Sequence, residues 1–593
     1  MAKEDGRLAD HEVRSLHHQV AAAVSGAIDR ALPEQAGADP VIRSSERADF
    51  QANAALALAR QAHCRPAELA ATVVDALPTD DLVAEVSVSG PGFVNLVLAD
   101  GAIWRQVAAR LTGPRHGIGT PQSGLRTVVE YSGVNIAKEM HVGHLRTTIL
   151  GDCLARVLDF LGAEVIRQNH LGDWGTQFGM LIQYLDEHPD VPWRRDQLAE
   201  GASAVSVLDD LYRAARREFD ADPEFADRAR SRVVVLQAGD EATLARWREI
   251  VAESELSFSD NYQRLGVLLR PEDSAGESFY NPWLAEVNAE LAAEGIAVDS
   301  DGALVVPSTT ETGPDGKPVV LMLRKSDGGY GYDTTDLAAI RYRVRDLRAN
   351  RILYVVDSRQ ALHFRLVFDT ARRAGWLPDG VEAVHVAYGA VLGPDGKPFK
   401  TRAGDTVRLL DLLATAVTKA RATVTEKSPD LPDAELDRIA EQAGIAAVKY
   451  ADLSTSRIKD YVFDVDRMVS STGNTGVYLQ YAHVRLRSIL RKAGASAAKI
   501  DPSLPPHPAE RALALALDAF GDILAEVGEV LEPHRLCGYL YELAKTFNEF
   551  YLACPVLSVG QPLRANRIAL CQLAADTLGR GLDLLGIAAP ERM

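Results

Sequence analysis

The sequence has few cysteines, and they are scattered. Its 593 residues include five cysteines, none of them in a C-x-x-C pair. A dispersed set of odd number is typical of reduced thiols, and it argues against a disulfide framework or a structural zinc site. We therefore expect a cytoplasmic protein, and the sequence offers no set of metal ligands.

Long apolar runs are also missing. No stretch reaches the roughly 18 consecutive apolar residues that a membrane-spanning helix needs. The opening residues, MAKEDGR, lack the apolar centre of a secretory signal. We therefore expect no membrane partner for this chain.

Basic residues are fewer than acidic residues. The chain has 64 Lys and Arg against 82 Asp and Glu, which gives a formal net charge of −18. Nucleic-acid-binding proteins usually carry a basic footprint, so the composition excludes a simple coat protein for nucleic acid. Contact with RNA would have to use local basic patches.

The chain does have length and apolar content. With 593 residues it is too long for one ordinary domain, so three to five are expected, and 47% apolar residues can supply their cores. The organising stretch begins at Thr127, Val128 and Val129, a β-branched run that predicts a buried strand. Apolar residues then recur at helical spacing from Leu145 to Leu161, before a second predicted strand at 163–167.

The loop between this strand and helix is the first turn of a predicted βαβ unit. It lies at the carboxyl end of a parallel strand, where unpaired backbone N–H groups and the helix dipole favour anions. His141 and His144 lie three apart on one helix face, and Gly143 lets a ligand approach the backbone. The pair could donate hydrogen bonds to a triphosphate. An H-x-x-H pair alone could also bind a metal or lie idle on the surface, but the zinc motif H-E-x-x-H is absent.

The residues around the histidines resemble a known family. His141-Val-Gly-His144 is similar to the HIGH motif of class I aminoacyl-tRNA synthetases, and residues 134–144 resemble its form in arginyl-tRNA synthetases. Residues 172–179, GDWGTQFG, resemble a second signature of that family. The resemblance covers nearly the whole chain. It implies a ligase that activates L-arginine with ATP to arginyl adenylate and transfers it to the 3′ end of its tRNA, releasing AMP and pyrophosphate.

The predicted fold is α/β, with a Rossmann-type parallel-sheet catalytic core interrupted by a helical insertion. An α+β domain precedes the core and an all-α helix bundle follows it. The predicted boundaries are 1–118 for the N-terminal tRNA-contacting domain, 119–189 and 301–410 for the two catalytic halves, 190–300 for the insertion, 411–469 for a helical connector and 470–593 for the anticodon-binding bundle.

The resemblance assigns ATP contacts to His141, Gly143 and His144. Asp173 follows the second strand and could orient a ribose or a histidine, or simply cap a helix. Magnesium should accompany ATP, although no ligand set for it can be identified and no tightly bound cofactor is expected.

Residues 396–404, GKPFKTRAG, resemble a degenerate KMSKS loop, the phosphate clamp of this class. Lys400 and Arg402 are its ATP-binding candidates, but Thr401 stands where the second lysine belongs. Lys138, three residues before the first histidine, is the predicted replacement, and it joins His141 and His144 as a catalytic candidate. A solvated surface lysine is the alternative.

A guanidinium group has five donors in a planar fork, so carboxylate and amide oxygens should line its pocket. Tyr332 and Asp336 are four apart at a predicted helix start, so both can face one site. An acid in a first turn is also ordinary compensation of the helix dipole. By resemblance, the arginine-binding positions are Glu130, Asn135, His141, Tyr332, Asp336 and Gln360.

Two regions are expected to contact tRNA. In the N-terminal domain Phe50, Gln51 and Asn53 are possible base contacts, although they could equally pack and cap the local helix. In the bundle Tyr481 and Arg485 belong to an aromatic and basic helix face suited to unstacked bases, although tyrosines on bundle helices are more often core. That face also includes Tyr478, Gln480, Arg487, Arg491 and Lys492. We expect a monomer.

Two other classes of function compete with a synthetase. One is a catalytically silent tRNA-binding relative, which the degenerate clamp loop would suit. The other is a small-molecule nucleotidyltransferase with the same histidine motif, which the long helical C-terminal region argues against.

Overall fold

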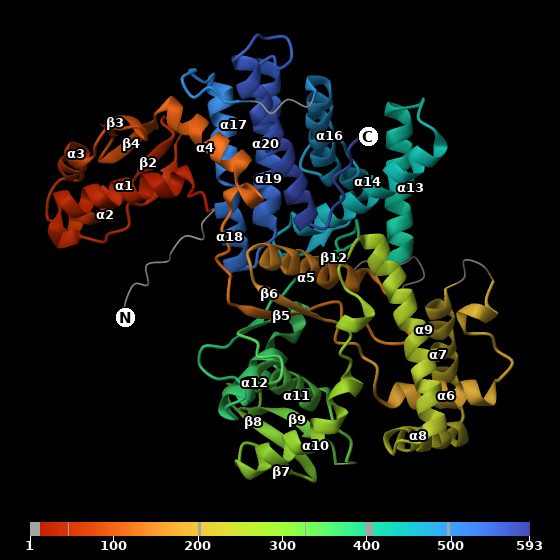
Figure 1. The fold of residues 1–593 in the computed structure, drawn as a ribbon. Helices are drawn as coiled ribbons and strands as arrows, with labels where there is room; N and C mark the ends of the chain where they lie inside the picture. Colours follow the sequence, from red (N-terminus) through yellow and green to blue (C-terminus); the bar gives the residue numbers. More distant parts are fainter. Residues whose placement is uncertain (1–11, 46, 200–202, 327, 398–406, 495–498) are drawn as a thin grey trace.

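The computed structural model describes the chain except residues 1–11, 46, 200–202, 327, 398–406 and 495–498. In Figure 1 the parallel sheet lies at the centre, with the N-terminal domain projecting to the upper left and the C-terminal helices above. The insertion lies at the lower right. This is the predicted α/β core with an α+β domain before it and an all-α domain after it.

The N-terminal domain packs helices on an antiparallel sheet of order β1-β2-β4-β3. The first described helix begins after Ser15, whose hydroxyl accepts the N–H of His18. The chain reverses at residues 90–92 to form an antiparallel hairpin. The elements are α1 (Leu16–Ala31), β1 (Ile42–Ser44), β2 (Phe50–Ala52), α2 (Ala54–Gln61), α3 (Pro66–Ala76), β3 (Val83–Ser89), β4 (Phe93–Leu98) and α4 (Asp100–Thr112).

The catalytic core is a four-stranded parallel sheet of order β11-β10-β5-β6. Its strands are β5 (Arg126–Glu130), β6 (Glu164–Gln168), β10 (Arg351–Tyr354) and β11 (Glu382–His385). The last residue of each strand lies beside that of its neighbour, so Gln168, Glu130, Tyr354 and His385 form one row at the carboxyl edge. The predicted βαβ unit is confirmed, because α5 (Val142–Phe160) connects β5 to β6.

The insertion leaves the core after β6. Helices α6 (Thr176–Glu187), α7 (Ala204–Ala221) and α8 (Pro223–Gln237) pack together, and the long α9 (Glu241–Leu265) returns to the core (Figure 1). The next helix, α10 (Glu277–Ala293), shares a hydrophobic core with the second catalytic half instead. That half adds β7 (Val298–Ser300), β8 (Ala303–Thr312), β9 (Pro318–Arg324), α11 (Tyr332–Arg345) and α12 (Ala361–Arg373).

The remainder of the chain is almost entirely helical. A short parallel pair, β12 (Val391–Leu392) and β13 (Tyr461–Val462), joins the catalytic half to the connector. No helix of the described residues is long and apolar enough to cross a membrane. The helices are α13 (Leu409–Lys427), α14 (Asp433–Leu453), α15 (Val465–Met468), α16 (Gly476–Ala493), α17 (Pro508–Asp518), α18 (Phe520–Val530), α19 (His534–Ala553) and α20 (Leu563–Leu584).

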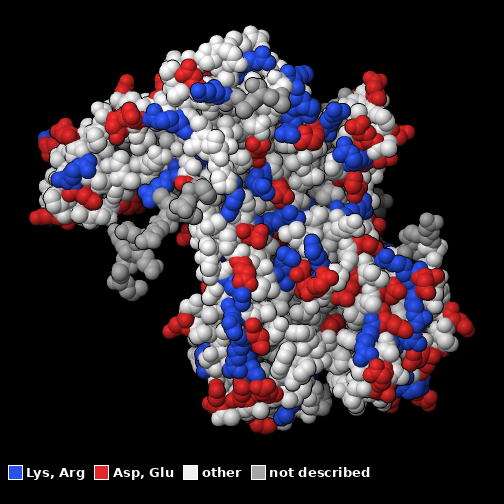
Figure 2. Space-filling view, viewed as in Figure 1, with Lys and Arg blue, Asp and Glu red and all other residues white. Residues whose placement is uncertain are grey.

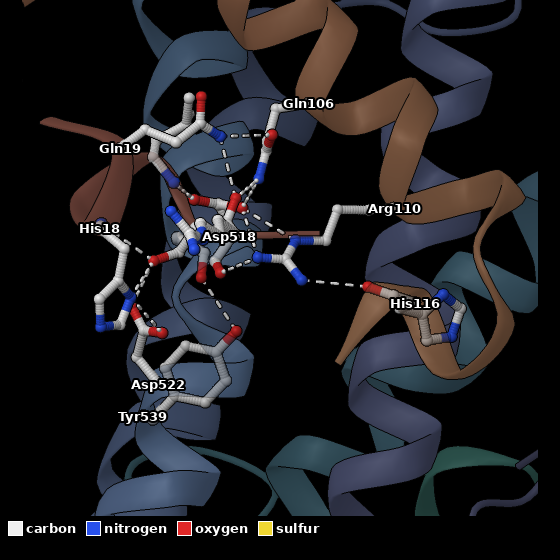
Figure 3. Close-up of polar contacts among 12 residues, drawn as sticks. His18, Gln19, Gln106, Arg110, His116, Asp518, Asp522 and Tyr539 are labelled. Atoms are coloured by element: carbon white, nitrogen blue, oxygen red, sulfur yellow. Dashed lines mark hydrogen bonds and ion pairs between the residues drawn. The ribbon is translucent and has the colours of Figure 1, made fainter. Parts of the chain in front are cut away.

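A buried carboxylate fastens the N-terminal domain to the bundle (Figure 3). Asp518 of α17 accepts the N–H of Leu16 at 2.5 Å and so caps α1 from another domain. It also pairs with Arg110 of α4 at 2.8 Å and accepts a bond from Gln106. Nearby, Asp522 raises the pKa of His18 by hydrogen bonding to it. These contacts attach the N-terminal domain to the C-terminal bundle.

Candidate functional site

The two histidines close the start of α5 with their own rings. His141 is the N-cap residue, and its Nδ1 accepts the N–H of Gly143 at 3.0 Å. The Nδ1 of His144 accepts the N–H of His141 at 3.1 Å, and the ring centroids lie 3.9 Å apart. A Cβ at position 143 would lie 2.7 Å from the first ring, so only glycine fits there.

This geometry corrects the prediction of unpaired N–H groups at the helix start. The N–H of Val142 is also taken, by the carbonyl of Val407 at 3.1 Å, and that of His144 by the carbonyl of His141. Phosphate oxygens must therefore be met by side chains at this turn. Since each Nδ1 accepts a hydrogen bond, the proton of a neutral ring lies on Nε2, which becomes the donor.

Both rings are held neutral. Burial lowers the pKa of His144 to about 3, and a proton on the neighbouring His141 or the charge of Lys138 would lower it in the same direction. Burial and Lys138 also lower the pKa of His141. Lys138 is half-buried, and its Nζ lies 5.2 Å from the ring centroid of Tyr212 in α7. The insertion thus contributes to the surroundings of this lysine.

Asn135 lies where two loops join at the sheet edge. The N–H of Ile136 donates to the carbonyl of Gly172, and the N–H of Gly172 donates to the carbonyl of Val134. A Cβ on Gly172 would overlap Oδ1 of Asn135. The glycine of the second signature is therefore needed so that the loop after β6 can lie against the loop before α5.

Glu130 ends β5 and pairs with a buried arginine. Arg343 of α11 contacts the Glu130 carboxylate at 2.5 Å and donates to Gln168 at 2.6 Å, and its side chain is fully buried. Its guanidinium also lies 5.0 Å from the ring centroid of Tyr354. One arginine therefore contacts the terminal residues of three strands.

Asp336 and Tyr332 meet at a histidine that the sequence analysis did not single out. His363 of α12 donates to Asp336 at 2.6 Å and lies 3.2 Å from Asp333. Its ring centroid is 5.3 Å from that of Tyr332, which is 66% exposed. Burial lowers the pKa of His363, but the two carboxylates outweigh it and raise the pKa to about 9. The exposed Gln360 precedes the same helix.

Two further carboxyl groups lie beside this cluster. Asp173 caps α10, where it accepts the N–H and hydroxyl of Ser278 at 2.8 and 2.6 Å. This side chain therefore caps a helix, and its role toward a ribose stays a prediction. Burial raises the pKa of Glu277 to about 8, and the charges of Asp173 and Asp336 add to the effect. Glu277 is thus a half-buried acid that forms no ion pair within the described part of the chain.

The proposed clamp residues Lys400 and Arg402 lie outside the described residues. The segment after them is fixed to the histidine turn, because the N–H of Leu409 donates to the carbonyl of Met140 at 2.9 Å. The segment before them enters through β12.

The candidate tRNA contacts divide between core and surface. Phe50 is 7% exposed and lies in the hydrophobic core, which favours its packing role. Gln51 donates to Asn95, and Asn53 precedes α2 as its N-cap residue. In the bundle the exposed Arg485 bonds Asn548 and lies 5.6 Å from the ring centroid of Tyr551.

Other members of the predicted basic face hold the C-terminal segment. Gln480 is fully buried and donates to the carbonyl of Ala588, while Arg487 and Arg491 contact Glu591. Tyr481 is half-buried. Figure 2 shows acidic and basic side chains interspersed over the visible face, so basic charge is local rather than spread.

Comparison with known proteins agrees with this geometry. Residues 114–465 match the model of the class I tRNA synthetase (R) catalytic domain, 479–593 the DALR anticodon binding domain and 15–98 the arginyl tRNA synthetase N-terminal domain. Arginine–tRNA ligase of Frankia casuarinae is 72% identical, covering 98% of this chain and 99% of that protein. That of Streptomyces coelicolor is 52% identical, covering 98% and 100%.

Solved structures are similar over the same length. Arginyl-tRNA synthetase of Plasmodium falciparum superposes with a TM-score of 0.82 at 27% identity, and that of Thermus thermophilus with 0.81 at 28%. Each comparison covers 98% of this chain and 100% of the other.

The parallel sheet, the histidine turn at its carboxyl edge and the matched catalytic domain define a class I aminoacyl-tRNA synthetase. The relatives that match over nearly their whole length identify the family within this class. The chain belongs to the arginyl-tRNA synthetase family, and it is an enzyme that aminoacylates tRNA with arginine, using ATP.

Proposed function

We propose that His141 and His144 hold the phosphates of ATP while the carboxyl groups at the starts of α10 and α11 hold the side chain of L-arginine. One observation supports this most directly. The histidines lie on the loop that follows the parallel strand β5. The acidic groups lie against residues that follow two other parallel strands, because Asp173 after β6 caps α10 and His363 of α12, the helix after β10, pairs with Asp336. Sheets of this type bind ligands at this carboxyl edge. The two substrates would meet between the histidines and the acidic groups.

The chemistry asks for positioning more than for a protein nucleophile. In the first step a carboxylate oxygen of arginine bonds to the α-phosphorus, the bond to the β-phosphate oxygen breaks and pyrophosphate leaves. In the second, a ribose hydroxyl of the 3′ adenosine attacks the acyl carbon and AMP leaves. The chain would hold the reactants in line and offset the phosphate charge through the Nε2–H groups, Lys138 and the residues at Lys400 and Arg402.

Magnesium would enter with ATP as part of the substrate. Within the described residues, the group of three metal-ligating side chains that lie close together is His17, His18 and Asp522, at the junction of the N-terminal domain and the bundle. Two imidazoles suit a transition metal better than magnesium. We assign no residue of this chain as a magnesium ligand, and Asp173 is already used to cap α10.

The guanidinium of arginine would balance the negative charge of its pocket. At neutral pH the cationic His363 balances one of the two carboxylates that flank it, Asp333 and Asp336, and the charge of Asp336 also raises the pKa of Glu277. A second cation would relieve this imbalance and let Glu277 ionise. Asp336 and Glu277 would take the donors of the fork, and Tyr332 would cover it. Asn135, Gln360 and Glu130 would line the same edge, with the charge of Glu130 offset by Arg343.

The aromatic and basic end of the bundle would contact tRNA. Arg485 and the 43% exposed Tyr551 offer a cation and a stacking surface, with Tyr481 on the same helix as Arg485. Gln51 and Asn53 remain candidates in the N-terminal domain. We also propose that the protein is a monomer and that it lies in the cytoplasm. The five free cysteines favour the cytoplasm, where thiols stay reduced.

ATP–pyrophosphate exchange with each amino acid, with and without tRNA, tests the proposal. We expect exchange only when the amino acid is arginine. A silent tRNA-binding relative would bind tRNA without exchange or charging, and another nucleotidyltransferase would exchange without an amino acid. Either outcome would contradict the proposal.

A further inference from the structure

Arg146 joins the catalytic helix to two segments that are distant in sequence. It lies on α5, two residues after His144, and its side chain is 1% exposed. Its Nε contacts Asp452 at the end of α14 at 3.3 Å. Its Nη1 donates to the carbonyls of Gly389 at 2.8 Å and Lys459 at 2.9 Å.

These two carbonyls form the base of the β12–β13 pair. The pair is parallel, with Val391 beside Tyr461. Gly389 lies so close to the second segment that a Cβ there would be 2.5 Å from Oδ1 of Asp460. The guanidinium also lies 5.2 Å from the ring centroid of Tyr461. Arg146 therefore fixes the point where the chain enters β12.

The segment that follows residues 398–406 contacts the start of the same helix. The N–H of Val142 donates to the carbonyl of Val407, and the N–H of Leu409 donates to the carbonyl of Met140. The described segments on either side of residues 398–406 thus both bind α5, one through Arg146 and the other through the histidine turn.

The end of α14 reaches other parts of the molecule as well. Lys449 donates to the carbonyls of Leu265 and Gly586, at the end of α9 and in the C-terminal segment. Tyr450 donates to Asn474 at 2.6 Å. Asp452, on the same turn, contacts Arg146, so this turn joins the insertion, the bundle and the catalytic helix.

We propose that Arg146 is a positioning residue for arginine activation, which keeps the base of β12 and the end of α14 in register with the helix start that carries His141 and His144. A buried ion pair is weak support for stability, because desolvation offsets much of the attraction, and fixing a register is its better-attested use. The planar fork of arginine can serve two carbonyls and a carboxylate together, whereas a lysine ammonium cannot span them. The inference rests on the proposed role of the two histidines.

Arg146→Lys tests it, because the variant keeps a cation opposite Asp452 but cannot reach all three partners. We expect the kcat of ATP–pyrophosphate exchange with saturating tRNA to fall by about 10-fold or more, with the KM for arginine within about 2-fold, as for a contact felt in the transition state. The matched control is Arg156→Lys. This arginine pairs with Asp152 at 2.8 Å on the same helix and donates to the carbonyls of Gly266 and Asp583, and within the described residues it makes no hydrogen bond to β12 or α14. We expect the kcat of this variant to stay near that of the wild type.

Gly389→Ala gives an independent test, because it displaces the base of β12 without altering the ion pair. We expect the same fall in kcat with an intact KM, and this variant decides the matter if Arg146→Lys does not fold. Normal kcat in Gly389→Ala, or equal losses in Arg146→Lys and Arg156→Lys that follow their melting temperatures, would overturn the inference. Absence of arginine-dependent exchange in the wild type would instead overturn the proposed function.

Discussion

His141 and His144 each use one ring nitrogen to cap α5 and keep the other for a ligand. The cap bonds hold the rings 3.9 Å apart and fix the proton of each neutral ring on Nε2. A substitution that removes a ring therefore changes both the helix start and the phosphate contact, and the two effects must be separated.

Asparagine separates them, since its side-chain oxygen can replace Nδ1 as a cap but offers no donor at the position of Nε2. We expect His141→Asn and His144→Asn to slow adenylation by about 10²–10³, or about 2.7–4 kcal/mol, the scale of one preorganised donor. Their melting temperatures should exceed those of the alanine variants, which lose about 1 kcal/mol of capping. ATP–pyrophosphate exchange and thermal unfolding measure the two effects. An unchanged exchange rate in both asparagine variants would contradict the assignment.

His363 should make stability depend on pH. Its pKa rises from the usual 6.5 to about 9 on folding, so its contribution is complete below pH 6.5 and is lost as the pH rises through 9. The contribution is on the order of 3 kcal/mol, from about 1.4 kcal/mol for each pKa unit. The difference in unfolding free energy between wild type and His363→Gln, measured from pH 6 to pH 10, should shrink over that window. The exposed His63→Gln is the control, and a difference of constant size would refute the coupling to Asp333 and Asp336.

Elements with a local pattern were predictable from the sequence, but their pairing was not. The strand, turn and helix at 126–160 follow from adjacent residues, and so does the placing of Tyr332 and Asp336 on one helix face. The sheet order depends on contacts such as Thr127 beside Arg351, which no local pattern encodes.

The same distinction explains the site residues that the sequence analysis missed. His363, Arg343 and Glu277 acquire their roles from neighbours on other helices, so a lone histidine, arginine or glutamate carries no signal. The sequence also did not show which ring nitrogen of each histidine is left for a ligand, because this depends on which backbone N–H the ring accepts.

The loop between β5 and α5 supplies Lys138 to the histidine turn. Burial lowers the pKa of both histidines and the charge of Lys138 lowers it further, so the lysine lies near the rings that we propose hold the phosphates. We expect Lys138→Met to slow adenylation by about 10²-fold, roughly 3 kcal/mol, with little change in the KM for arginine, because the contact is made mainly in the transition state. Exchange assays compare it with Lys400→Met and Arg402→Met. A near-normal rate in Lys138→Met, with collapse in a loop variant, would show that the loop carries its own cation.

At the scale of the whole molecule, several polar contacts attach the N-terminal domain to the bundle, among them Arg511 with Asp49 and Asp518 with Arg110. Asp518 accepts the N–H of Leu16 at the start of α1, pairs with Arg110 and accepts a bond from Gln106 (Figure 3). The tRNA substrate must span the bundle and the catalytic sheet, so the attachment of the N-terminal domain should affect tRNA more than arginine.

Asp518→Asn leaves Arg110 buried without its anion, a change that typically costs about 3–5 kcal/mol. We expect a lower melting temperature and a higher KM for tRNA in aminoacylation, with the KM for arginine unchanged. Asp522→Asn is the graded control, because its side chain is 32% exposed and its pair with His18 should contribute little. Equal tRNA KM values in wild type and Asp518→Asn would show that this contact stabilises the fold without positioning the domain.

The central claim is that the carboxyl groups at the starts of α10 and α11 recognise arginine separately from the histidines that hold ATP. Asp336→Asn tests it most directly, since the change keeps size and removes charge. Arginine affinity should fall by about 2–5 kcal/mol, as for one partner of a desolvated charge pair, while ATP affinity stays within about 2-fold. An intact KM for arginine together with a lowered melting temperature would contradict the claim, because Asp336 would then serve only His363 and its own helix.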